Sequence, residues 1–184
     1  YAASYFANVD VAYIRVWNRL LSDEEAMQLY EEHSAHKYEG IATDGLVFHL
    51  DSSNPISYPG GGEIWTDMVS GVAMTAQSAT LDLVADVGGS SIKSFRMDGM
   101  GYFLSDDNYD KVDMAGPTTL IIWYYNQNLA ERDTIFEKAG TSYRSYEQEI
   151  AVTWETSRTW SFFSRYDDFD SAGTTAHYSN QWNM

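Results

Sequence analysis

The sequence contains no cysteine and few positive charges. Without cysteine the chain forms no disulfide bond and no thiolate metal site. Lysine and arginine number 11 against 27 aspartates and glutamates, which gives a formal net charge of −16. Such a surface repels nucleic acid and anionic membranes and attracts divalent cations. The charge balance therefore argues against nucleic acid as a partner.

The sequence also lacks any apolar run near the ~20 residues that span a bilayer, and it shows no signal peptide. We expect no membrane insertion. The chain begins at Tyr1 and not at a methionine, so we read it as a segment of a longer polypeptide. Hydrophobic residues make up 44% and aromatic residues 15%, which favours a folded domain over a disordered one.

The hydrophobic pattern predicts many strands and one helix. Residues 9–17 alternate as a strand, with Val9, Val11 and Tyr13 on one face and Ala12 and Ile14 on the other. Ser22 and Glu25 then form a capping box, and a helix follows that would bury Ala26, Leu29, Tyr30 and His33. Further strands are predicted over residues 45–51, 119–125, 145–155 and 159–166. Many strands with glycine-rich turns predict an all-β fold of the jelly-roll β-sandwich type, with one short helix near the N-terminus.

Two stretches of the sequence resemble a known family. VAYIRVWNRLLSDEEAMQLYEEH (11–33) resembles the closing strand and short helix of laminin-G-like, concanavalin A-like domains. DGLVFHLDSSNPISYPGGGEIWTDMVSG (44–71) resembles the opening of another such domain. The family's next strands are matched by Phe95, Met97, Asp98, Gly99 and Tyr102 and by TLIIWYYNQN (119–128). The version it resembles occurs in bacteriophage tail-fibre and virion-surface proteins, which implies an extracellular or virion-surface location.

The closing unit precedes the opening unit, which leaves two interpretations of the domain organisation. Residues 1–38 are the end of one module, 39–44 a linker, and 45–184 most of a second module. Alternatively, residues 1–38 dock back onto 45–184 as a permuted closure, because the first and last strands of this fold lie side by side. An edge left open would invite pairing with another chain.

Two acidic clusters are candidates for calcium. Asp106, Asn108 and Asp110 form a D-x-N-x-D run that can present several oxygens to Ca²⁺, as can Asp167, Asp168 and Asp170. Lys111 stands where an EF-hand needs glycine, so the first is not an EF-hand. For both clusters the alternative is a solvated polar loop. For Asp67, in the W-T-D-M-V-S-G turn, we expect a structural role and not metal ligation.

Aromatic residues of the later strands are candidates for carbohydrate binding, because sugar C–H faces stack on aromatic rings. The candidates are Trp154, Trp160 and Tyr166. The same residues at period two are also typical of one half of a sandwich core.

Hydrolysis is the enzymatic alternative, since many relatives of this fold cleave glucans with two carboxylates roughly 5–10 Å apart. Glu147 and Glu149 have suitable spacing but lack the E-x-D-x-x-E pattern of those enzymes. The four histidines do not cluster, and no nucleotide-binding or serine-hydrolase motif is present.

The sequence thus predicts a non-enzymatic module of an extracellular or virion-surface appendage. Its partners would be surface polysaccharide, neighbouring copies or other subunits, with calcium as the candidate cofactor. The alternatives are a purely structural protein without a ligand and a glycoside hydrolase.

Overall fold

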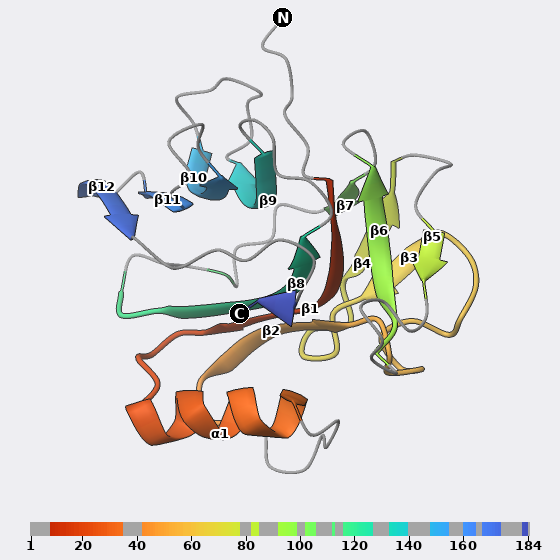
Figure 1. The fold of residues 1–184 in the computed structure, drawn as a ribbon, viewed down its shortest axis with the longest axis horizontal. Helices are drawn as coiled ribbons and strands as arrows, with labels where there is room; N and C mark the ends of the chain where they lie inside the picture. Colours follow the sequence, from red (N-terminus) through yellow and green to blue (C-terminus); the bar gives the residue numbers. More distant parts are fainter. Residues whose placement is uncertain are drawn as a thin grey trace, which may run out of the picture.

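The computed structural model describes residues 8–34, 42–77, 82–84, 92–98, 102–105, 112, 116–126, 133–139, 148–154, 160–164, 167–173 and 182–183. Within them the chain is mostly β-strands in antiparallel sheets, with one short helix (Figure 1). The elements are β1 (Asn8–Trp17), α1 (Asp23–Ser34), β2 (Leu46–Asp51), β3 (Ile64–Thr66), β4 (Ala73–Ala76), β5 (Asp82–Val84), β6 (Ser94–Asp98), β7 (Phe103–Ser105), β8 (Thr119–Asn126), β9 (Asp133–Ala139), β10 (Gln148–Trp154), β11 (Trp160–Ser164), β12 (Asp167–Gly173) and β13 (Trp182–Asn183). The predicted excess of strand over helix is confirmed.

Strand β1 lies inside a six-stranded sheet and is hydrogen-bonded along both edges. One edge pairs with β8 from Val9 to Trp17. The other edge pairs with β6 over residues 8–11 and with β2 over residues 13–17. β6 and β2 therefore follow one another along the same side of β1, while β5 pairs with β6 and β13 with β8. The predicted N-terminal strand thus shares a sheet with strands from much later in the chain.

A β-bulge at Ala12 marks the point where β1 changes partner from β6 to β2. Val11 and Tyr13 pair with Tyr124 and Trp123, which are adjacent in β8, so Ala12 is the extra residue. The extra residue reverses the alternation of the strand. The prediction that Tyr13 shares a face with Val9 and Val11 is therefore wrong, since one hydrophobic cluster holds Val9, Val11, Ile14 and Val16 and the other holds Ala12, Tyr13 and Trp17.

Ser52 ties this junction together. Its backbone N–H donates to the Ala12 carbonyl at 3.0 Å. Its hydroxyl lies 2.9 Å from the same carbonyl oxygen and 2.6 Å from the carbonyl oxygen of Lys93. Three strands therefore meet at one buried serine, because Ala12 belongs to β1, Ser52 follows β2 and Lys93 precedes β6.

The six-stranded sheet has two different faces, which we call the core face and the helix face. The core face packs against residues of the two smaller sheets, β3–β4–β7 and β9–β12, among them Trp65, Ile135 and Val152. The helix face carries Tyr13, Trp17, Ile121 and Trp123 and packs against Leu29 of α1. In Figure 1, α1 lies on one side of β1, β2 and β8, and β9–β12 lie on the other.

Aromatic rings fill the part of the core between β6 and the β3–β4–β7 sheet. Phe95 lies 4.7 Å from Tyr58, 4.8 Å from Trp65 and 4.8 Å from Phe103, measured between ring centroids. These contacts have edge-on or tilted geometry, which aromatic pairs prefer over face-to-face stacking. The ring cluster therefore fixes the small sheet against the large one.

The helix begins where the capping box predicts it. The Glu25 N–H donates to the Ser22 hydroxyl at 3.2 Å, and the Ser22 N–H donates to the Glu25 carboxylate at 2.9 Å. Leu29 is buried as predicted, whereas Tyr30 is 48% exposed, so the prediction that it is buried is wrong. The His33 side chain lies outside the described ones. No helix in the described ranges is long and apolar enough to cross a membrane.

Candidate functional site

The two tryptophans predicted to bind sugar are cross-strand partners. Trp154 ends β10 and pairs with Trp160 at the start of β11, and cross-strand partners share a face of the sheet. The pair thus flanks the connection between β10 and β11, and the two indole side chains lie outside the described part of the structure.

The structure describes some of the other predicted binding residues, which lie in strands, and does not describe the rest. Tyr166, the Asp106–Asp110 run and Glu147 lie outside the described residues. Asp167, Asp168 and Asp170 lie in strand β12, where Asp168 pairs with Ser164, so the loop predicted for them is wrong. Glu149 lies in β10. In the ranges that the structure covers, no group of three or more histidine, aspartate or glutamate residues is placed to hold a metal ion.

Asp67 has the structural role that its turn predicts. It is fully buried, and its carboxylate accepts hydrogen bonds from the N–H groups of His49 at 2.7 Å, Val69 at 3.1 Å and Ser70 at 3.1 Å, and from the Ser70 hydroxyl. A carboxylate with this many donors closes the turn and joins it to β2.

The helix face contains a buried polar group that sequence reasoning missed. Arg15 of β1 is paired in register with His49 of β2, and its Nε donates to the His49 Nε2 at 2.9 Å. The guanidinium lies 4.2 Å from the centre of the Tyr13 ring, a cation–π contact. Arg15 and His49 are 3% and 6% exposed. An arginine can only donate, so this geometry requires a neutral histidine as acceptor.

The electrostatics of this group follow from burial. Burial, and secondly the charge of Arg15, lowers the pKa of His49 to about 3. Burial also raises the pKa of Asp51, against the opposing effect of the Ser53 N–H, which donates to its carboxylate at 2.9 Å. Asp51 pairs in register with Tyr13, two residues along β1 from the Arg15–His49 pair. The group joins β1 to β2.

An ion pair lies where β1 meets β6. The Arg96 Nε donates to the Asp10 carboxylate at 3.0 Å, and the two residues are paired in register. The Asp10 side chain is fully buried, whereas that of Arg96 is 44% exposed. This pair fixes the register of β1 against β6 as the Arg15–His49 pair does against β2.

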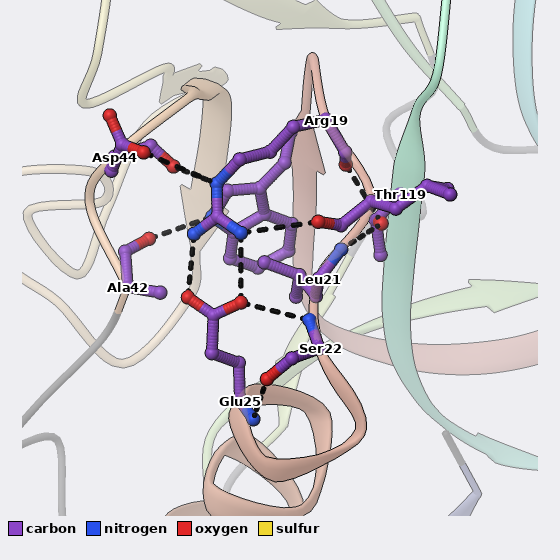
Figure 2. A network of polar contacts seen from close by, with 9 residues as sticks. Arg19, Leu21, Ser22, Glu25, Ala42, Asp44 and Thr119 are labelled. Atoms are coloured by element: carbon purple, nitrogen blue, oxygen red, sulfur yellow. Dashed lines mark hydrogen bonds and ion pairs between the residues drawn. The ribbon is translucent and has the colours of Figure 1, made fainter.

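A polar network holds the connection between β1 and α1, as Figure 2 shows. The Arg19 guanidinium makes two hydrogen bonds to the Glu25 carboxylate, at 2.8 and 2.6 Å, and its Nε donates to the Asp44 carbonyl at 2.8 Å. The Arg19 hydrogen bond, and secondly the Ser22 N–H, lowers the pKa of Glu25 to about 2. The Thr119 hydroxyl accepts from the Leu21 N–H and donates to the Arg19 carbonyl, both at 3.0 Å. The network ties the start of α1 to β8 and to the chain that enters β2.

One flank of α1 presents a shallow apolar depression. It is lined by Asp23, Ala26, Met27 and Tyr30, which recur at helical spacing and so share one side of the helix. Met27 is 58% and Tyr30 48% exposed, and the Tyr30 ring lies 6.0 Å from that of Trp123 beneath it.

One feature of the sequence could have revealed the buried polar pairs. Asp10 and Arg15 interrupt an otherwise apolar strand, as do His49 and Asp51 in the next. A charged residue in a central strand is buried only with a partner. The partners themselves depend on the register of β1 with β2 and β6, which local patterns do not specify.

Comparison with protein-family models, with curated proteins and with solved structures finds no match to this chain.

Proposed function

We propose that the chain is a non-enzymatic, laminin-G-like jelly-roll module of an extracellular or virion-surface appendage, and that its main role is structural assembly with neighbouring subunits. The sandwich part of this proposal is supported by the shared hydrophobic cluster. That cluster draws residues from all three sheets and lies on one face of the largest, as packing between sheets requires. The pairing of β1 with β2, β6 and β8 supports the permuted closure, in which residues 1–38 complete the module that follows.

The observation that carries the assembly role is the kind of apolar side chain that reaches the surface. The tryptophans with described side chains, Trp17, Trp65 and Trp123, are at most 5% exposed. Among the described side chains, the exposed large apolar residues are one tyrosine, Tyr30, and the non-aromatic residues Leu20, Met27, Ile56, Ile64, Val69 and Leu104. Sugar-binding faces need exposed rings, whereas aliphatic side chains serve contacts between proteins.

Two of these aliphatic residues lie on a common sheet face. Ile64 of β3 and Leu104 of β7 are both paired in register with Thr75 of β4, so the three form one outward row. The row carries no charge on a chain whose net charge is −16, and uncharged surface is what a contact between acidic copies requires.

Light scattering over a range of protein and salt concentrations tests the assembly role. We expect oligomers that grow with protein concentration and are favoured by salt, which screens the negative charge of the copies. A monomer under every condition would contradict assembly with further copies of this chain.

Carbohydrate binding is a second candidate, and the Trp154–Trp160 pair beside the β10–β11 connection supports it. A glycan array, run with calcium and again with EDTA, tests it. Binding that Trp160→Ala abolishes would favour an aromatic site, and binding that EDTA abolishes would favour the aspartate clusters. A folded protein that binds no glycan would leave assembly as the sole role.

The non-enzymatic part of the proposal is supported by the roles of the buried carboxylates. Asp67 closes a turn, Asp51 accepts from the backbone beyond β2, and Asp10 pairs with Arg96. A glycosidase needs two carboxylates that face its substrate, and these three are occupied in holding the fold.

A further inference from the structure

Residues 8–34 form a unit of β1 and α1 that packs on strands formed by later residues. β1 pairs with β2, β6 and β8, and the helix that follows packs on the same sheet. A single connection, between residues 34 and 42, joins this unit to the rest of the described chain. The unit could therefore leave its place in the sheet as one piece if that connection extended away.

The place that β1 occupies is a slot with four sides. Two sides are the hydrogen-bonding edges of β8 and of the β6–β2 pair, and the other two are hydrophobic layers. β1 fills the layers with Val9, Val11, Ile14 and Val16 on the core face and with Tyr13 and Trp17 on the helix face. Without β1, two unpaired strand edges would border this slot, which is the arrangement that accepts a strand from another chain.

The slot is specific for the sequence of β1. Asp10 must meet Arg96, and Arg15 must meet His49. The Ala12 bulge must fall where Ser52 can donate to its carbonyl. A shift of one residue would place every side chain on the wrong face. The strand that fits this slot is therefore β1 of this chain, supplied either by the same copy or by a second one.

The helix adds little to hold the unit in place. Leu29 is the buried residue of α1 among those with described side chains, while Met27 and Tyr30 remain about half exposed. Arg19 and Glu25 travel with the unit, and the contacts of Arg19 with Asp44 and Thr119 can form equally with another copy. Eight residue steps separate Ser34 from Ala42, and a chain of that length spans at most roughly 25 Å.

We propose that the β1–α1 unit is exchanged between copies, so that residues 8–34 of one copy fill the slot between β8 and the β6–β2 pair of its neighbour. Exchange repeats the contacts of the monomer between chains, so it links copies without requiring a new interface. The inference rests on the proposed assembly role and supplies its mechanism.

The Asp10–Arg96 pair allows a complementation test. Copies with Asp10→Arg carry two arginines at this place, and copies with Arg96→Asp carry two aspartates. When the two are unfolded and refolded together, exchange restores an opposite-charge pair in both slots. We expect the mixture to form heterodimers that melt about 5 °C or more above either variant alone. A mixture that melts as the sum of its two components would overturn the proposal.

A cysteine test covers the case in which a charge variant fails to fold. Because the chain has no cysteine, copies with Leu21→Cys and copies with Thr119→Cys each carry one thiol. These positions adjoin, since the Leu21 N–H donates to the Thr119 hydroxyl at 3.0 Å. After joint refolding and mild oxidation we expect disulfide-linked heterodimers several-fold above a control mixture of Ile56→Cys and Thr119→Cys copies, whose Ile56 is 75% exposed.

A yield equal to that of the control would overturn exchange. Light scattering on the same samples separates this result from failure of the assembly role. Oligomers without the specific disulfide would mean assembly through another surface. Monomers without the specific disulfide would contradict both the exchange and the assembly role.

Discussion

The two faces of the six-stranded sheet are buried by different means. The core face is covered by two further sheets and holds hydrophobic side chains, with the Phe95 ring cluster among them. The helix face packs against Leu29 and Tyr30 of a single helix. Strands β1 and β2 bury four ionisable residues, Asp10, Arg15, His49 and Asp51.

This difference indicates which face provides most of the folding free energy and which face selects the register of β1. Apolar packing on the core face provides free energy that depends little on which strand supplies the methyl groups. Ion pairs and hydrogen bonds on the helix face provide less net free energy, because the charged groups lose their hydration. They do require particular partners, so they select one register of β1.

The largest expected effect lies on the core face. Phe95→Ala removes the ring that Tyr58, Trp65 and Phe103 surround, and we expect the free energy of unfolding to fall by about 4 kcal/mol. Denaturant unfolding measures this change in the free energy of unfolding. Leu104→Ala, at a 39% exposed position of the small sheet, is the matched control and should cost less than about 1 kcal/mol. Equal losses in the two variants would mean that the ring cluster does not join the sheets.

The helix face should make the protein sensitive to acid. The folded protein keeps His49 neutral to about pH 3, whereas an unfolded histidine takes up a proton near pH 6.5. Between these values the unfolded state binds more protons, so stability is lost as the pH falls. At about 1.4 kcal/mol per pH unit, we expect a loss of roughly 3 kcal/mol between pH 6.5 and 4.

Asp51 acts in the opposite direction. Its pKa is raised in the folded state, so the folded protein takes up that proton first as the pH falls, which offsets part of the loss. His49→Gln separates the two contributions, since a glutamine carbonyl can still accept from Arg15 and does not titrate. Unfolding free energies measured from pH 7 to 4 should fall less steeply in this variant, and identical slopes would remove His49 as the cause.

The smallest expected effect concerns the attachment of the helix. Ser22→Ala removes the hydroxyl that accepts from the Glu25 N–H, and it should cost about 1 kcal/mol of unfolding free energy. Ser22→Thr keeps the hydroxyl and should restore most of that loss. If hydrogen exchange of the α1 amides is unchanged in Ser22→Ala, the capping box does not hold the helix.

Local patterns predicted the elements better than they predicted the faces of those elements. The alternation of residues 9–17 and the Ser22–Glu25 spacing located β1 and α1, because strand period and helix capping depend on neighbours in sequence. The bulge at Ala12 was not predicted, since it depends on Ser52 and on the change of partner strand.

The candidate sites show the same limit. Asp67 was correctly assigned to a turn, because the residues that donate to its carboxylate include its near neighbours Val69 and Ser70. The Arg15–His49 pair was missed, because it depends on the register between strands far apart in the sequence. The polar composition of Asp167–Asp170 suggested a loop, but pairing with β11 places these residues in a strand. The calcium and sugar sites proposed from the sequence remain predictions.

The central place of β1 also has a consequence for the order in which the protein forms. β1 is synthesised before β8, and Val9 pairs with Asn126, so one edge of β1 has no partner until β8 has been made. At typical rates of synthesis that interval is on the order of ten seconds. Contacts so distant in sequence also close slowly. During that time the nascent chain carries an apolar strand with an unpaired edge. A chaperone or a second nascent chain can bind this edge before β8 pairs with it.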